Sequence, residues 1–295
     1  YHIFEEYAYY LVSEARQKCA NHIFKLGGNV YAFDSTTIDL CLSVFWWAKF
    51  RKKKGGIKVH TLYDVETQIP AFFHITEASV HDSKVMIEIP YEPSSYYIFD
   101  RGYNNFKMLY KIHQIEAYFV VRAKKNLGYK SIQWKRRLPK NVLSDASVLL
   151  TGFYPKQYYP EPLRLVKYWD EEQEREFTFI TNAMHISALQ VAELYKNRWQ
   201  VELFFKWLKQ HLKIKRFWGT TENAVRIQIY AAICAYCLVA IIQHDMQLNR
   251  STYEVLQILS ISLTDKTHLR DLFDKTKFQN DKERFGPNGP SLFNF

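Results

Sequence analysis

The chain has 295 residues, of which 47% are hydrophobic and 24% are charged. This composition is typical of a globular protein and excludes a disordered, collagen-like or low-complexity chain. The 40 basic and 30 acidic side chains give a net charge of +10, which favours a polyanionic partner, nucleic acid first and an anionic membrane second.

Cysteine usage and the N-terminus favour an intracellular protein. Four cysteines are too few for a disulfide framework. Glu5 and Glu6 lie among aromatic residues at the N-terminus, without a basic start and an apolar core, so no signal peptide is expected. The chain opens at Tyr1 without an initiator Met, and we expect a fragment or a processed chain.

The first part of the chain predicts a mixed α/β layer with a partly antiparallel sheet. Runs of β-branched and aromatic residues indicate strands, and apolar spacing at three and four residues indicates helices. Three early strands joined by short turns imply an antiparallel meander. The predicted elements are a helix over Phe4–Ala20, strands over Val30–Ile38, Ile57–Tyr63 and Ile69–Ile75, a short helix after His81-Asp82-Ser83, a strand over Tyr96–Asp100, a helix over Phe106–His113 and a strand over Ala117–Arg122.

Residues 124–182 change character, because short strand-like pieces alternate with prolines. Leu163–Trp169 and Phe177–Thr181 flank an acidic turn and predict a hairpin. We interpret this region as an all-β insertion.

The chain then becomes helical. Ser187 and Gln190 have the spacing of a capping box, and the helix that follows is expected to run to about Leu212. A second helix covers roughly Glu222–Met246 and contains the longest uncharged run, which is too short and too polar for a membrane span and predicts a buried core helix. A shorter helix is expected near Tyr253–Ile261, and the tail over Asn280–Phe295 is expected to be loose.

The first of these helices carries an unusual charged face. At the helical period, one acid and four cationic or phenolic side chains share that face: Tyr195, Arg198, Glu202, Lys206 and Lys209. One reading is a solvated face in which Glu202 pairs with Arg198 and Lys206. The other is a metal-dependent phosphodiester site, in which the carboxylate binds metal and its neighbours hold phosphates.

Two aspartates lie in or at the end of apolar strands, where a carboxylate is costly unless it is paired or binds metal. Asp34 is embedded in the first strand, and Asp100 ends Tyr96–Phe99. Each alone is compatible with a strand-end cap or a turn. Together with Glu202 they predict a site for two divalent ions, for which oxygen ligands select Mg²⁺ or Mn²⁺.

These residues carry a resemblance to a known family. Asp34-Ser-Thr, Asp100-Arg-Gly-Tyr and the spacing Tyr195-x2-Arg198-x3-Glu202-x6-Lys209 resemble the DDE transposases of the insertion-sequence-four group and their tyrosine-arginine-glutamate-lysine signature. The segments 56–60 and 78–83 are also similar to that group. The resemblance covers about residues 28–245 and implies a ribonuclease-H-like mixed sheet flanked by helices, with a β-rich insertion before the acidic helix.

The resemblance also implies roles. Asp34, Asp100 and Glu202 would form the catalytic, metal-binding triad for Mg²⁺, with Mn²⁺ as a substitute and two ions expected. Tyr195, Arg198 and Lys209 would contact phosphates near the element's end. The DNA-binding residues that we predict are, in full, Tyr195, Arg198, Lys206, Lys209, Lys213 and Arg101.

Related enzymes cut and paste through a hairpin at the transposon end, where an aromatic residue of the insertion receives a flipped base. Trp134 and Trp169 lie in the insertion and are the candidates for this stacking, although we favour a packed β-domain residue for each. Members of the group usually carry a DNA-binding region ahead of the first aspartate, and only 33 residues precede Asp34 here. Sequence-specific recognition of the ends is therefore in question.

We therefore expect five segments. They are an N-terminal helical segment (1–27), the first part of the core (28–123), the β-rich insertion (124–182), the second part of the core with the acidic helix (183–250), and a C-terminal helical segment with its tail (251–295).

Three further features of the sequence each allow a functional and a structural interpretation. Four basic clusters, at 51–54, 124–125, 135–137 and 213–216, favour a DNA track over ordinary solvated surface because they recur. Cys234 and Cys237 have CxxC spacing in an apolar helix and are read as core residues. His81-Asp82-Ser83 is read as a helix N-cap supplied by Asp82 or Ser83 rather than as a catalytic remnant.

The sequence therefore predicts a transposase that cleaves transposon ends and transfers the strand into target DNA. The alternatives are a stand-alone ribonuclease-H-like nuclease and a non-catalytic DNA-binding remnant. The expected partner is double-stranded DNA, both terminal repeats and target, with a homodimer on paired ends. No membrane and no ATP are expected, and the expected location is the cytoplasm, at the nucleoid.

Overall fold

The computed structural model describes residues 1–20, 24–51, 54–211, 217–250, 252–262, 266 and 268–275. It divides into two compact units, Tyr1–Ile241 and Ile242–Phe295. All of the predicted site residues that are described lie in the first unit. In the second, Arg250 accepts a hydrogen bond from Gln243 through its carbonyl and donates one to the carbonyl of Phe273.

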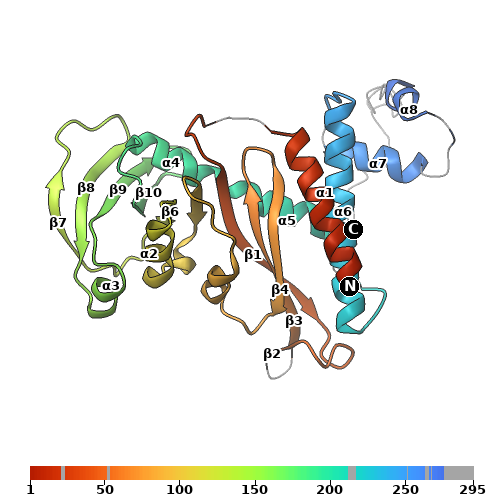
Figure 1. Cartoon of the computed structure of the whole chain (residues 1–295), viewed down its shortest axis with the longest axis horizontal. Coiled ribbons are helices and arrows are strands. Elements are labelled where there is room, and N and C mark those ends of the chain that lie inside the picture. Colours follow the sequence, from red (N-terminus) through yellow and green to blue (C-terminus); the bar gives the residue numbers. More distant parts are fainter. Residues whose placement is uncertain are drawn as a thin grey trace, which may run out of the picture. The chain divides into compact units, whose positions relative to one another are not determined.

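The strands of the first unit form one sheet, which has ten members in the described residues (Figure 1). The strands are β1 (Val30–Leu40), β2 (Lys49–Arg51), β3 (Lys54–Asp64), β4 (Ile69–Glu77), β5 (Tyr96–Phe99), β6 (Tyr118–Arg122), β7 (Tyr129–Trp134), β8 (Val142–Leu150), β9 (Leu163–Asp170) and β10 (Arg175–Thr181). Their order is β2-β3-β1-β5-β6-β10-β9-β8-β7, and β4 pairs with β3, so β7 forms one edge of the sheet.

The helices lie on the two faces of this sheet. They are α1 (His2–Lys18), α2 (Phe106–Gln114), α3 (Phe153–Tyr158), α4 (Ala188–Asn197), α5 (Trp199–His211) and α6 (Glu222–Asp245), with the 3-10 helices η1 (Asp82–Glu88) and η2 (Arg101–Tyr103). The second unit contains the end of α6 with α7 (Thr252–Ser262) and α8 (Leu269–Lys275).

The part of the sheet formed by β4, β3, β1, β5 and β6 has mixed parallel and antiparallel pairing, as expected for the core that the resemblance implied. β1 pairs antiparallel with β3, and β3 pairs antiparallel with β4, which confirms the predicted meander. β1 pairs parallel with β5, and β5 pairs parallel with β6. The fold is therefore a mixed α/β layer with helices on both faces.

Side-chain alternation along the strands divides the core into two layers. Ala32, Ile98 and Val120 point to one face, where they pack with α1, α4, α5 and α6. Phe33, Phe99 and Val121, one residue further along each strand, point to the opposite face, toward η1, η2 and α2. The next residue on each strand consequently returns to the α4 and α5 face.

Residues 124–182 supply four strands and the short helix α3. The predicted hairpin is confirmed, because β9 and β10 pair antiparallel across the acidic turn. β10 also pairs antiparallel with β6, so the strands of this region continue the core sheet.

Two sequence predictions need correction. The expected single helix from Ser187 is interrupted at Arg198, whose backbone N–H bonds to the carbonyl of Tyr195, three residues back, at 3.1 Å. The capping box of Ser187 and Gln190 is confirmed at the start of α4. At η1 the N-cap is His81, whose ring accepts from the backbone N–H of Ser83, and not Asp82 or Ser83 themselves.

The apolar helix α6 meets the core-helix expectation. Cys234 and Cys237 are buried in it as free thiols, and burial raises the pKa of both. Among the described residues, α6 is also the one helix whose length and composition would allow it to cross a membrane, but half of its most apolar window is buried inside the protein.

Candidate active site

Three polar residues stand side by side where the parallel pairing of the central strands ends. The last β1–β5 pair is Phe33 with Phe99, and the last β5–β6 pair joins Phe99 to Val121. The following residues are Asp34, Asp100 and Arg122. Neighbouring strands lie about 4.8 Å apart, and alternation turns all three side chains to the face that α4 and α5 cover. The two predicted aspartates are therefore neighbours.

Glu202 on α5 is linked to Asp34 by Arg198. The Arg198 guanidinium donates from Nη1 to Asp34 Oδ2 at 2.7 Å and from Nη2 to Glu202 Oε1 at 2.5 Å. The three side chains are only 14% (Arg198), 22% (Asp34) and 33% (Glu202) exposed. The solvated-face reading is therefore wrong for Glu202 and Arg198, because the pair is tied to a strand aspartate 164 residues away in the chain.

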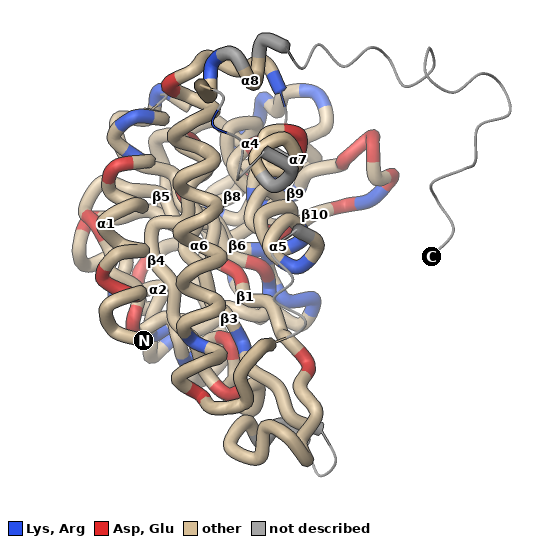
Figure 2. Tube along the Cα trace, turned by 90° about the vertical axis from the view of Figure 1, so that its right-hand side faces the viewer, with Lys and Arg blue, Asp and Glu red and all other residues tan. Residues whose placement is uncertain are grey.

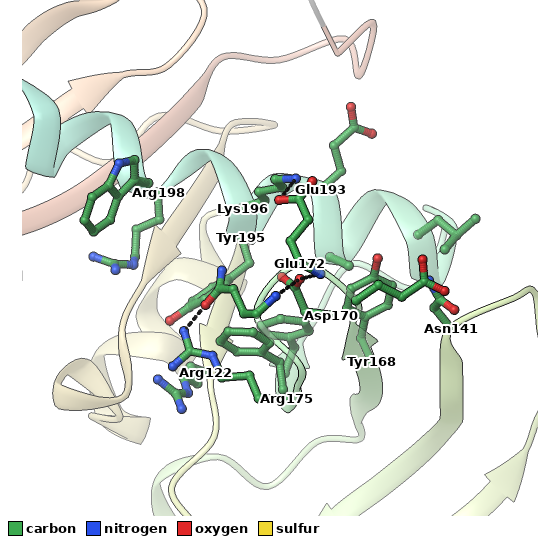
Figure 3. Close-up of a pocket in the computed structure, with 17 residues that line it drawn as sticks. Arg122, Asn141, Tyr168, Asp170, Glu172, Arg175, Glu193, Tyr195, Lys196 and Arg198 are labelled. Carbon is green, nitrogen blue, oxygen red and sulfur yellow. Dashed lines mark hydrogen bonds and ion pairs between the residues drawn. The ribbon is translucent and has the colours of Figure 1, made fainter.

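Tyr195 completes the arrangement from α4. Its hydroxyl donates to Asp100 Oδ1 at 2.8 Å, and its ring packs against Phe177 and Phe179 of β10. The Arg198 guanidinium lies 5.7 Å from the centre of that ring. Figure 3 shows Tyr195 and Arg198 on the same side of the helix pair, near Arg122. The helix break at Arg198 thus gives the two carboxylates of the strands separate partners.

The electrostatics of the site follow from this crowding. Burial raises the pKa of Asp34 to about 6, Arg198 and the backbone N–H of Ser35 oppose the rise, and the nearby Glu202 and Asp100 add to it. Burial disfavours the charged form of Arg198, but Tyr195, Asp34 and Glu202 together raise its pKa above the usual value. Burial, followed by the charge of Asp100, raises the pKa of Tyr195 to about 12. Asp34 and Glu202 therefore share one cation, Arg198. Figure 2 shows acidic and basic positions close together along the chain near β1, β6 and α5.

A second layer of contacts fixes the strand at Asp34. Ser35 Oγ donates to Asp82 Oδ1 at 2.8 Å, and Lys58 Nζ lies 3.0 Å from the same oxygen. Tyr103 donates to Asp34 Oδ1 at 3.5 Å. The segments 56–60 and 78–83, which the sequence analysis noted beside the triad, thus meet at Ser35. Asp82 orients its neighbours here and does not cap a helix.

The other predicted DNA-binding residues have varied positions. Lys209 Nζ donates to the carbonyl of Thr37, in the strand β1 that also carries Asp34, at 3.0 Å. Lys206 on α5 and Arg101 in η2 are exposed. Lys213 lies outside the described residues. Trp134 and Trp169 are 58% and 40% exposed, so the favoured reading of both as packed residues is wrong.

Sequence reasoning missed Arg122. It follows the apolar strand Tyr118–Val121 just as Asp100 follows Tyr96–Phe99, and this position was the available signal. Arg122 lines a cavity of about 800 Å³ beside Tyr195 and Arg198, and its guanidinium lies 5.0 Å from the Phe177 ring. Acids of the β9–β10 turn line the opposite side, where Glu172 pairs with Lys196 at 2.8 Å (Figure 3).

The carboxylates fit a divalent ion by chemistry. Three oxygen donors come from separate elements; burial is the main cause of the raised pKa of Asp34, and the charges of Glu202 and Asp100 add to it. A hard cation relieves both the burial of charge and the repulsion between the carboxylates. As the side chains are placed, no group of three or more Asp, Glu, His or Cys residues in the described ranges is close enough to hold a metal. Arg198 occupies the position between Asp34 and Glu202.

Comparisons with known proteins agree on one family. Residues 25–238 match the family model described as the transposase DDE domain. The chain is 37% identical over 246 residues to y4zB of Sinorhizobium fredii, which is named as a transposase, covering 81% of this chain and 67% of the relative. It is 31% identical over 205 residues to a protein of Geobacillus stearothermophilus named as a transposase of insertion sequence element IS5377, covering 70% and 54%.

A third relative is a protein of a Synechocystis strain named as a transposase of insertion sequence element IS4SA, 25% identical over 250 residues and covering 80% of this chain and 67% of the relative. The chain thus spans between half and two thirds of the length of these relatives. Among solved structures, a piggyBac transposase synaptic complex with hairpin DNA has a TM-score of 0.49 and 13% identity, covering 89% of this chain and 59% of that one.

Proposed function

This chain belongs to the transposase DDE domain family, and we propose that it cleaves DNA at transposon ends and joins the freed ends to target DNA. The observation that carries the proposal is the convergence of Asp34, Asp100 and Glu202, from two adjacent strands and a helix, on Tyr195 and Arg198. The triad would hold Mg²⁺, with Mn²⁺ as a substitute.

When bound, two such ions would activate the attacking oxygen and stabilise the leaving oxygen. The protein's own residues have separate tasks. Asp34 and Asp100 are fixed by rigid strands, and the Tyr195 hydroxyl orients the Asp100 carboxylate by its hydrogen bond. Glu202 is carried by the helix α5, which covers this face of the sheet, so its carboxylate points toward the strands from the helix layer.

Arg198 serves as the phosphate-binding cation nearest the reaction. In the protein alone it neutralises Asp34 and Glu202. The guanidinium would donate to a phosphate once Asp34 and Glu202 hold the divalent ion, and its planar fork is suited to that contact. Lys209 of α5, which is bonded to Thr37 of β1, would hold a neighbouring phosphate.

Cleavage and joining use the same in-line phosphoryl chemistry, first with water and then with a DNA 3′-hydroxyl, so one triad can serve both. We further propose a hairpin intermediate, with an exposed tryptophan of the insertion, Trp134 or Trp169, stacking on a displaced base. Assembly as a homodimer on paired ends and action at the bacterial nucleoid complete the proposal.

The first test replaces Glu202 by Gln, which keeps the shape of the side chain and removes its charge. Nicking of supercoiled plasmid DNA in Mn²⁺ should fall to background, while DNA binding measured by gel shift should stay close to that of the parent. Glu88→Gln, on an exposed position of η1, is the matched control and should nick like the parent. Parent-level nicking by Glu202→Gln would overturn the triad.

The same preparations separate the two alternatives. A nuclease on this fold would nick plasmid DNA but would never join a 3′-hydroxyl end to a second DNA. A non-catalytic DNA-binding remnant would shift DNA without nicking it. Incubating the parent with a labelled duplex that ends in a free 3′-hydroxyl, and scoring joined products on a denaturing gel, therefore decides between transposase and nuclease.

A further inference from the structure

A second cavity lies next to the candidate active site and has a strongly basic lining. It measures about 310 Å³, and five cations line it: Arg101, Arg122, Lys124, Lys125 and Lys167. We call it the basic groove. Its acidic residue is Glu176, whose carboxylate lies 3.8 Å from Lys167 Nζ in a largely solvated pair. Such an excess of positive charge requires an anion of more than one charge.

Most of these cations lack an internal partner. Arg101, Lys124 and Lys125 are exposed, and among the described residues they form no ion pair. Arg122 contacts the Phe177 ring. Because no acid in the described part of the chain forms an ion pair with these four cations, they are available to an external ligand.

The backbone that carries the groove is fixed before any ligand arrives. Ala123 donates its N–H to the carbonyl of Thr178 in β10 at 2.8 Å, and the carbonyl of Arg122 accepts from Asn104 Nδ2 at 2.8 Å. Leu127 closes a turn on the carbonyl of Lys124 at 3.1 Å. The cations therefore project from an ordered edge, which lowers the entropic cost of binding.

The groove adjoins the cavity beside the active site. Arg122 lines both the groove and the larger cavity beside Tyr195 and Arg198. Arg101 directly follows Asp100, the residue that Tyr195 holds. A linear polyanion bound across the triad would consequently enter the groove at Arg122 and Arg101 and continue toward Lys124 and Lys125.

We propose that the basic groove binds the sugar–phosphate backbone of duplex DNA adjacent to the scissile phosphate. This inference rests on the proposed function, because that function places DNA at the triad. Within the groove, Arg122 holds the phosphate next to the one that Arg198 binds, and Lys124, Lys125 and Lys167 hold those that follow. The exposed ring of Tyr129 at the rim adds an apolar contact to the sugar edge.

The test compares two double variants of equal charge. Lys124→Gln/Lys125→Gln removes two groove cations, and Lys107→Gln/Lys111→Gln removes two exposed lysines of α2 that line neither cavity. Affinity for a labelled DNA duplex of mixed sequence is measured in EDTA as salt is raised. Each lost phosphate contact should reduce the slope of log affinity against log salt by about one, so the groove variant should lose about one to two units and the control should match the parent.

The outcomes separate the groove from the proposed function. Equal slopes for the two double variants, or a parent that binds no duplex DNA, overturn the groove. If a duplex RNA of the same sequence competes more strongly than DNA, the DNA assignment is overturned. Plasmid nicking in Mn²⁺ is scored separately, so a parent that binds through the groove but never nicks leaves the groove standing and removes the catalytic function.

Discussion

Arg198 links the strand carboxylate and the helix carboxylate of the candidate site. Its two bonds explain how a buried carboxylate at Asp34 and a second one at Glu202 lie close to one another. They also explain why the helical pattern alone was ambiguous. Glu202 and Arg198 do form the i,i+4 pair that a solvated face would show, and only the third partner, from a distant strand, distinguishes a site from a surface.

At the same scale, Asp34 makes the stability of the protein depend on pH. Its pKa is raised from 3.8 to about 6, so its contribution to the free energy of unfolding is fully present below about 4 and is lost as the pH rises through 6. His60 acts in the opposite direction, because burial lowers its pKa from 6.5 to about 4, and its contribution is lost as the pH falls. The changes in the free energy of unfolding with pH that Asp34 and His60 cause therefore partly cancel in the parent protein.

Asp34→Asn removes the pH dependence of stability that Asp34 causes. Urea unfolding of parent and variant in EDTA, at a series of pH values between 4 and 7, should show the stability of the parent relative to the variant declining as the pH rises. A shift of about two pKa units corresponds to about 3 kcal/mol over this interval, reduced by the exposed part of the side chain. A difference that stays constant with pH would contradict the raised pKa.

Among the elements, α4 is fixed by a buried ion pair far from the triad. Arg164 of β9 is 2% exposed and binds Asp145 of β8 through two bonds of 2.7 Å. It also donates to the carbonyls of Ala183 and Ile186, directly before α4. The helix that carries Tyr195 is therefore anchored to the strands of residues 124–182.

Arg164→Met should destabilise the protein by about 3–5 kcal/mol, because it leaves the Asp145 carboxylate buried with only the half-exposed Lys135 nearby. Lys140→Met is the control, since its pair with Glu171 is exposed and contributes little. Urea unfolding measures both. A loss for Arg164→Met no larger than that of Lys140→Met would show that the buried pair does not anchor α4.

Some features of the elements can be predicted from the sequence and others cannot. Strands were predicted where β-branched and aromatic residues cluster, as at Val30–Ile38, and alternation along them explains why Asp34 leaves the apolar layer. The break at Arg198 was not predicted, because the apolar period continues through it. Arg122 was missed because a cation that ends a strand resembles any solvated terminus until the parallel register sets it beside Asp100.

At the scale of the molecule, residues 124–182 belong physically to the core sheet. β10 covers the edge of β6, so the buried Val120 and Val121 have neighbours on both sides only when β10 is present. Sequence could not show this, because the prolines and the change in character at 124 resemble a domain boundary. Strand pairing between Arg122 and Phe179 is a non-local contact that no local pattern encodes.

Replacing residues 124–182 by a short Gly-Ser linker should therefore abolish cooperative unfolding of the first unit, measured by circular dichroism. Replacing only the turn residues 171–174 by a two-residue Asn-Gly turn keeps both hairpin strands and should leave a cooperative transition. If the larger deletion unfolds cooperatively near the midpoint of the parent, the core is independent of these strands.

The outermost strand has a consequence for how copies of this protein behave toward one another. β7 ends the sheet and is exposed along nearly its whole length, so its backbone offers a row of unpaired donors and acceptors. An open edge of this kind invites a second chain to add a strand and begin aggregation. Lys130 on β7, with the exposed Arg136 and Arg137 just after it, gives every copy the same positive edge. Like charges meet whenever two such edges approach. This repulsion disfavours strand pairing between the β7 edges of two copies.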